Sequence, residues 1–123
     1  MKIKEIMSAK VQCVNKHKSI REAAKIMRDY NVGSVPVEDD GKIVGIISDH
    51  DLAVVAMAEG KMSDTTTVAE CMSKGAKYCF EDEEIEHVKE VMHQFHISRI
   101  PVMNSDRRLV GSVTIADIEK RAS

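Results

Sequence analysis

Two short stretches of the chain share a spacing of residues that could bind a nucleotide. Each begins with glycine, has serine or threonine three residues later and aspartate three residues after that: Gly45–Asp51 and Gly111–Asp117. A strand that ends at the hydroxyl and leads into a helix would place the unpaired N–H groups and positive dipole of that helix beside these side chains, which suits an anion. An aspartate one turn into the helix can accept hydrogen bonds from the two hydroxyls of a ribose.

The same spacing also fits a structural role. Ser48 with Asp51, and Thr114 with Asp117, have the spacing of a capping box, in which the N-cap hydroxyl and the N3 carboxylate each accept a backbone hydrogen bond from the other residue. Gly45 and its counterpart could allow close packing within a strand, or could leave room in the wall of a cleft. One carboxylate can cap a helix and also bind a ligand, so the pattern leaves both roles open.

The phrase occurs twice because the chain is a tandem repeat. Sliding the sequence along itself aligns Glu5–Ser8 with Glu70–Ser73 and Val32–Val37 with Ile97–Val102. One residue is inserted before the two glycine-to-aspartate stretches come into alignment. The predicted boundaries are residues 1–59 for the first repeat, 60–67 for a connector and 68–123 for the second repeat.

Each repeat has the pattern of a strand, a helix, two strands and a second helix. Ser19 and Glu22 have capping-box spacing before apolar residues at helical intervals. The prolines of SVPVE and RIPVM donate no backbone hydrogen bond, so we expect them at a strand start or edge. The sequence therefore predicts an α+β fold, with two βαββα repeats packed with pseudo-twofold symmetry into one module. We expect strands at 11–14, 34–38, 42–47, 77–80, 99–103 and 109–113, and closing helices at 49–59 and 115–121.

The composition argues against several classes of protein. Hydrophobic residues make up 43% and charged residues 31% of the chain, as in ordinary globular domains. The net charge of −2 and the lack of a basic run do not favour nucleic acid. The apolar runs are much shorter than the roughly 20 residues of a membrane span. The first residues have no apolar signal region, and three cysteines form no disulfide framework, so we expect a cytoplasmic protein.

The repeated unit resembles the CBS domain, and the tandem pair resembles a Bateman module. The resemblance rests on VGSVPVEDDGKIVGIISDHDLA and ISRIPVMNSDRRLVGSVTIADIE, covers nearly all of the chain, and is strongest with stand-alone proteins of two CBS domains. It implies a non-catalytic regulatory or sensor module without a required cofactor. Such modules bind adenosine compounds, namely AMP, ADP, ATP, NAD(H) or S-adenosylmethionine, in clefts between the two repeats.

Carried over residue by residue, the resemblance implies two related clefts. In the first, Asp117 would hold the ribose with Thr114 beside it. Arg99 matches a position where family members often place a phosphate-binding arginine. Val32 and Gly33 of the other repeat would face the base.

The second cleft departs from the family pattern. Its expected residues are Ser48, Asp51, Ile97, Ser98 and His50. Ser34 stands where Arg99 stands in the other copy, and His50 stands where many relatives carry arginine. His50 could charge at about pH 6 to 7 and help to bind a phosphate, although a solvated histidine at a helix start explains it equally well. We predict that the Arg99 cleft is the better nucleotide site and that the second cleft is weaker, empty or pH-sensitive.

The sequence leaves one alternative function open and gives little support to another. A protein-interaction adaptor with vestigial clefts is the alternative, and a homodimer or an unidentified effector protein is expected as partner. An enzyme is poorly supported, because no nucleophile has a paired base and no phosphate-binding P-loop is present. Short terminal segments predict that no catalytic domain is appended.

Two sets of potentially reactive side chains have plainer interpretations. His87, His93 and His96 recur on one predicted helix, but no further ligand completes the roughly four that zinc prefers, so we expect a solvated face and no metal site. Cys13 and Cys79 lie near the starts of equivalent strands, where we expect them to be buried as small apolar residues.

Overall fold

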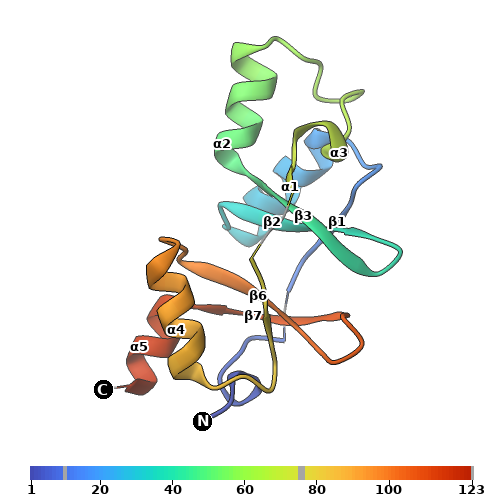
Figure 1. The fold of residues 1–123 in the computed structure, drawn as a ribbon. Coiled ribbons are helices and arrows are strands. Elements are labelled where there is room, and N and C mark those ends of the chain that lie inside the picture. The colour runs from blue at the N-terminus through green and yellow to red at the C-terminus, as the bar shows by residue number, and fades with distance from the viewer. Residues whose placement is uncertain (10, 75–76, 123) are drawn as a thin grey trace. The chain divides into compact units, whose positions relative to one another are not determined.

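The computed structural model describes residues 1–9, 11–74 and 77–122. The chain divides into two compact units. Unit 1 consists of residues 1–11 and 77–123, and unit 2 consists of residues 12–76. Each unit combines a small mixed sheet with helices, which confirms the predicted α+β class (Figure 1).

Unit 2 contains a four-stranded sheet in the order β1-β2-β3-β4. Strand β1 is parallel to β2, whereas β2 with β3 and β3 with β4 are antiparallel. The Ser19 hydroxyl accepts a hydrogen bond from the backbone N–H of Glu22 and so caps α1, as the sequence predicts. The elements of unit 2 are β1 (Val14–Asn15), α1 (Ile20–Tyr30), β2 (Ser34–Asp39), β3 (Lys42–Ser48), α2 (Asp49–Leu52), the π-helix η2 (Ala53–Ala58), α3 (Val68–Cys71) and β4 (Ser73–Lys74).

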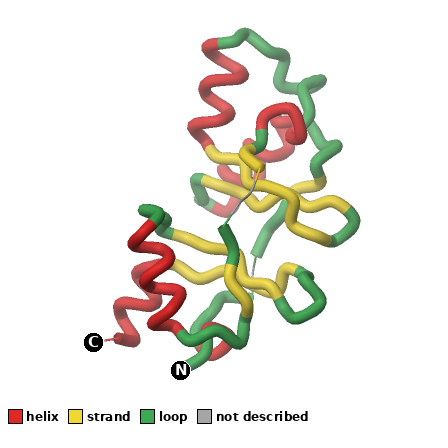
Figure 2. Tube along the Cα trace, in the orientation of Figure 1, coloured by secondary structure: helices red, strands yellow, loops and turns green. Residues whose placement is uncertain are grey.

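Unit 1 contains a three-stranded sheet in the order β5-β6-β7. Its strands and helices can be followed by colour in Figure 2. Helices α4 and α5 lie side by side against the β6–β7 hairpin (Figure 1). The elements of unit 1 are the short 3-10 helix η1 (Ile3–Glu5), β5 (Cys79–Phe80), α4 (Ile85–Gln94), β6 (Arg99–Met103), β7 (Leu109–Thr114) and α5 (Ile115–Ala122).

Each unit has its own hydrophobic core. Alternation along the paired strands places every second side chain in that core, while the intervening side chains point to the other face of the sheet. The core of unit 1 consists of Ile3, Cys79, Ile85, Val88, Met92, Ile100, Val102, Val113 and Ile118. The core of unit 2 consists of Val14, Ile20, Ala23, Met27, Val35, Val37, Ile47 and Val68.

The opening segment of each sequence repeat belongs to the unit formed by the rest of the other repeat. In unit 1, Ser8 pairs with Ser112 of β7 through two backbone hydrogen bonds of 2.8 and 2.9 Å. Ile3, from the same opening segment, is fully buried in the core of unit 1. In unit 2, Ser73 of the second repeat pairs with Ile46 of β3 in the corresponding way. The compact units therefore differ from the sequence repeats in this one segment.

The two repeated glycines allow these opening segments to approach. A Cβ atom on Gly111 would lie 2.5 Å from the carbonyl oxygen of Ser8, and one on Gly45 would lie 2.7 Å from that of Ser73. A methionine sulfur would also lie only 2.9 Å from each of these two Cβ atoms. Close packing, one of the two roles considered from the sequence, therefore explains both glycines.

The prolines lie at the third position of strands that have a neighbour on each side, whereas the sequence predicts a strand start or an edge. Strand β2 is flanked by β1 and β3, and β6 is flanked by β5 and β7. Pairing with β1 begins only at Val37, so no β1 residue is paired with Pro36. Pro101 likewise precedes Val102, where pairing with β5 begins. Each proline is tolerated because the neighbouring strand is too short to reach it.

The prediction that Cys13 is buried is wrong. Val37 pairs with Val14, and the equivalent Val102 pairs with Cys79, so the counterpart of Cys79 is Val14 rather than Cys13. Because side chains alternate along an extended chain, this shift of one residue places Cys13 in an exposed position. Cys79 is buried, as expected.

Candidate functional site

The strand-to-helix turn of unit 1 brings Thr114 and Asp117 together. Thr114 ends β7 and α5 begins at the next residue. The N–H of Asp117 donates to the Thr114 hydroxyl oxygen at 3.1 Å, and the N–H of Thr114 donates to Oδ2 of Asp117 at 3.4 Å. The capping box predicted from the sequence is therefore present.

Unit 2 repeats this geometry at Ser48 and Asp51. The N–H of Asp51 donates to the Ser48 hydroxyl oxygen at 3.1 Å, and the N–H of Ser48 donates to Oδ2 of Asp51 at 2.9 Å. Both side chains are partly buried, whereas His50 is exposed at the start of α2. Within the described part of the chain, each aspartate uses only Oδ2 in these bonds, so Oδ1 remains a hydrogen-bond acceptor.

A second segment lies beside each turn. In unit 1, the N–H of Ile115 donates to the carbonyl of Ser98 at 2.9 Å, and Arg99 pairs with Thr114 across the β6–β7 ladder. In unit 2, the N–H of Asp49 donates to the carbonyl of Gly33 at 2.9 Å. Ser34 pairs with Ser48 in the same manner.

The predicted site residues thus form two sets, each within one unit. The unit 1 set is Ile97, Ser98, Arg99, Thr114 and Asp117, and the unit 2 set is Val32, Gly33, Ser48, His50 and Asp51. Each set gathers at the end of a β-hairpin where a helix begins. The sequence predicts clefts that each combine residues of both sets, and that combination remains a prediction.

Arg99 gives the unit 1 set a positive charge that the unit 2 set lacks at the equivalent position. The Arg99 side chain is exposed, and its Nη1 donates to Oγ of Ser112 at 3.3 Å. The equivalent residues of unit 2 are Ser34 and Ile46. Guanidinium groups suit phosphate because they offer several donors in a planar fork.

Asp49 belongs to the unit 2 set but was not predicted from the sequence. Its carboxylate lies at the mouth of the turn, where Oδ2 would be 3.3 Å from a Cβ atom placed on Gly33. Ile115 takes the equivalent position in unit 1, where it follows Thr114 as Asp49 follows Ser48. The unit 2 set therefore carries two carboxylates, Asp49 and Asp51. The signal was visible in the sequence, where SDHD stands in one repeat and TIAD in the other.

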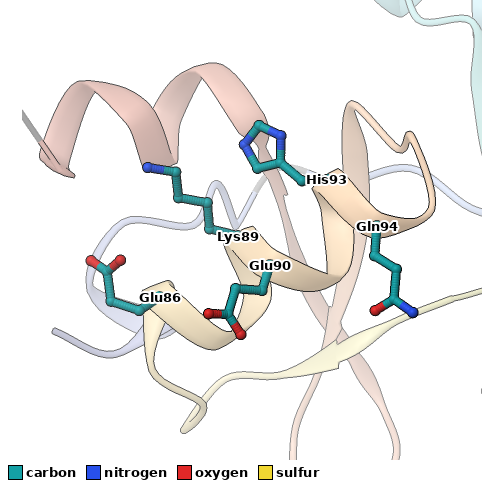
Figure 3. Close-up of a pocket in the computed structure, with 5 residues that line it drawn as sticks. All are labelled: Glu86, Lys89, Glu90, His93 and Gln94. Atoms are coloured by element: carbon teal, nitrogen blue, oxygen red, sulfur yellow. The ribbon is translucent and has the colours of Figure 1, made fainter.

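The histidines of α4 lie on an exposed helical face. His87 contacts Glu83 and His93 contacts Glu119, with nitrogen–oxygen distances of 3.4 and 3.5 Å. A shallow depression on α4 is lined by Glu86, Lys89, Glu90, His93 and Gln94. Figure 3 shows that Lys89 and His93 point away from the side to which Glu90 and Gln94 point, so these groups do not converge. Among the residues that the structure describes, no three or more His, Cys, Asp or Glu side chains are grouped as metal ligands.

The buried thiol of Cys79 is strongly perturbed. Burial raises its pKa to about 12, and the nearby Glu83 carboxylate adds to this effect. A thiol needs to ionise to act as a nucleophile, so Cys79 is unreactive near neutral pH. It therefore serves the core and not a site.

Within the described ranges, no helix has the length and apolar character needed to cross a bilayer.

The sequence model of the CBS-domain family matches residues 3–57 and 68–123 of the chain. Together with the repeated fold and the two equivalent strand-to-helix turns, this match shows that the chain belongs to the CBS-domain family and carries two copies of the domain.

Known proteins of this family resemble the chain over almost its full length. Hypoxic response protein 1 of Mycobacterium tuberculosis is 34% identical over 95% of this chain and 82% of its own length. A crystal structure of Hypoxic Response Protein I with two coordinated zinc ions has a TM-score of 0.86 and 32% identity, and covers 98% of both chains. The CBS domain pair of protein MJ0100 in complex with 5′-methylthioadenosine and S-adenosyl-L-methionine has a TM-score of 0.77 and 36% identity, and covers 99% of this chain and 95% of that one.

Proposed function

We propose that this protein is a non-catalytic regulatory module that binds adenosine-containing ligands. The observation that carries the proposal is the hydroxyl–aspartate pair at the strand-to-helix turn, which has the same geometry in both units. In each pair one carboxylate oxygen completes the capping box and the other can accept a hydrogen bond. The solved CBS domain pair that is 36% identical and holds two adenosine compounds supports this class of ligand.

Three residues of the unit 1 set have distinct roles in the proposed site. Asp117 accepts hydrogen bonds from the ribose hydroxyls, and Thr114 adds a polar contact beside it. Arg99 binds the phosphate of AMP, ADP or ATP, and the exposed N-terminal turn of α5 adds its positive dipole. Val32 and Gly33 of the other repeat face the base.

The unit 2 set forms the weaker site in this proposal. Ser48 and Asp51 take the roles of Thr114 and Asp117, with Ile97 and Ser98 opposite. The site has serine in place of Arg99, and Asp49 adds a second carboxylate, so a phosphate meets repulsion there. His50, at the start of α2, is the remaining candidate for a phosphate contact at this site.

Regulation follows from where the ligand binds. A ligand that contacts both repeats favours the arrangement that it binds more tightly, and it can shift the population only by that difference in affinity. The module would pass this change to its own dimer or to an effector protein in the cytoplasm. NAD(H) and S-adenosylmethionine share the adenosine group and are further candidate ligands.

The test is a calorimetric titration with AMP, ATP, NADH and S-adenosylmethionine. We expect Asp117→Asn to weaken the strongest binding event about 30-fold or more, since the ribose loses charge-assisted hydrogen bonds. The asparagine oxygen can still accept the cap hydrogen bond, so the stability of the protein should change little. Asp51→Asn, the matched control in unit 2, should spare that event. If no adenosine compound binds at about millimolar concentration, the aspartates are helix caps only and the proposal is wrong.

An interaction adaptor is the second candidate. It is favoured by exposed apolar side chains on η2, where Met57 is 82% and Val54 38% exposed. Such groups on a helix could contact a second copy of the chain or another protein. Sedimentation of the wild type and of Met57→Lys, with and without AMP, separates the two candidates. An assembly that depends on Met57 in a protein that binds no nucleotide supports the adaptor.

A further inference from the structure

Ser112 is a buried hydroxyl in the middle of a strand. Val113 points into the core of unit 1, so Ser112 and Thr114 project from the opposite face of β7. The Ser112 residue is 5% exposed, and in the described part of the chain only Thr66 is a comparably buried polar residue. Buried hydroxyl groups are normally hydrogen-bonded, so the partner of Ser112 indicates its role.

That partner is the guanidinium of Arg99. The distance from Nη1 of Arg99 to Oγ of Ser112 is 3.3 Å. Arg99 pairs directly with Thr114, so Arg99 and Ser112 are diagonal neighbours on the same face of the hairpin. The contact holds the guanidinium beside β7 and uses one of its five N–H donors. The other donors can bind a ligand.

The equivalent pair is absent from unit 2. Ser34 takes the position of Arg99, and Ile46 takes the position of Ser112. An isoleucine fills this position without a hydrogen-bond partner, so the fold of the hairpin does not require a hydroxyl there. The hydroxyl occurs in the unit that has the arginine, which connects its role with Arg99.

We propose that Ser112 is a positioning residue that holds the Arg99 guanidinium ready to bind the anionic group of an adenosine ligand. This inference rests on the proposed function, and it makes the unit 1 site selective for phosphate-bearing over uncharged adenosine compounds. An exposed arginine loses much side-chain freedom when it binds a phosphate. A guanidinium that is already held over the strand loses less, so the affinity for the anion rises while the affinity for adenosine is unaffected.

The test compares AMP with adenosine by calorimetry. We expect Ser112→Ala to weaken AMP binding about fivefold, because the Arg99 side chain then loses more freedom when it binds the phosphate, and to leave adenosine binding unchanged. Ser112→Thr keeps the hydroxyl and should retain the AMP preference. Arg99→Ala should remove the preference, and the double variant Arg99→Ala/Ser112→Ala should match it, because the two residues act as a unit. Ser105→Ala, in the exposed turn of the same hairpin, is the control.

Several outcomes would overturn the inference. Equal weakening of AMP and adenosine by Ser112→Ala would show a merely structural role. Tighter AMP binding would show that Ser112 competes with the phosphate for Arg99. If Ser112→Ala lowers the melting temperature, Ser112→Cys fills the same space with a weak acceptor and gives the same comparison. If Arg99→Ala removes the AMP preference but Ser112→Ala does not, this inference fails and the proposed function stands, whereas a wild type that binds neither AMP nor adenosine contradicts both.

Discussion

Unit 1 and unit 2 have the same order of strands and helices around the strand-to-helix turn, but the side chains next to that turn carry opposite charges. Each has a hydroxyl–aspartate capping box and a glycine against which an opening segment packs. In unit 1 the turn is flanked by Arg99 and Ile115. In unit 2 the corresponding residues are Ser34 and Asp49.

This difference separates what the repeat needs to fold from what it needs to bind. Residues that are the same in both units, such as Gly45 with Gly111, are explained by packing or capping. Residues that differ on the same backbone, such as Asp49 with Ile115, are not required by the fold. They are therefore the positions at which the two sites can acquire different ligands.

The largest effect is expected from the shared glycines. Gly111→Ala would place a Cβ atom 2.5 Å from the Ser8 carbonyl oxygen, and because that atom belongs to the backbone the opening segment has to move away from β7. We expect a loss of about 1–3 kcal/mol in the free energy of unfolding, measured with urea. Gly45→Ala, with a distance of 2.7 Å to the Ser73 oxygen, should cost a similar amount.

Gly33→Ala is the matched control for these variants. A Cβ atom at Gly33 meets only the flexible end of the Asp49 side chain, at 3.3 Å. Its effect on stability should therefore be small. If Gly111→Ala is as stable as Gly33→Ala, the opening segment is not held tightly and the two units do not share this constraint.

A smaller effect is expected from the charge of Asp49. Asp49→Asn removes one carboxylate from the unit 2 set and should strengthen AMP binding at the weaker site about two- to fivefold at low ionic strength. Calorimetry would show this as a tighter or newly visible second binding event. Asp40→Asn makes the same change of charge in the β2–β3 turn of unit 2, at a backbone φ of 54° that asparagine also adopts. Equal gains in the two variants would mean that only net charge matters and that Asp49 is not at the site.

Much of the fold follows from local sequence signals. Strand β6 occupies 99–103 as predicted, and the capping boxes at Ser48 and Thr114 are present, because hydrophobic alternation and capping depend on neighbouring residues. The exchange of opening segments could not be predicted in this way. It depends on contacts between residues as distant in sequence as Ser8 and Ser112.

In the candidate site, too, the residues marked by local sequence signals were predicted, and those that depend on contacts between distant residues were not. The repeated phrase pointed to Asp51 and Asp117, but Asp49 and Ser112 were missed. Their importance depends on which side chain lies across from them, and that is set by strand register and loop geometry. Cys13 was placed wrongly for a related reason, since β1 is only two residues long and its register is set by its parallel partner β2.

The smallest expected effect comes from this difference between the two cysteines. Burial raises the pKa of Cys79 from 9.0 to about 12. Well below pH 9 the thiol is protonated in both the folded and the unfolded state, and near and above pH 9 only the unfolded state releases the proton. The contribution of Cys79 to stability is therefore complete near neutral pH, begins to fall as the pH approaches 9, and is lost as the pH rises toward 12.

Between pH 7 and pH 9 Cys79 should account for a loss of about 0.4 kcal/mol, so Cys79→Val should lose that much less stability than the wild type. Partial desolvation and Glu38 raise the pKa of the Cys13 thiol as well, but its side chain is exposed. Cys13→Val should therefore leave most of the pH dependence in place.

Alkylation with N-ethylmaleimide at pH 8, followed by peptide mass spectrometry, should modify Cys13 and spare Cys79. Equal labelling of the two thiols would mean that β5 opens readily, and that a two-residue strand does not protect its core side chain in unit 1.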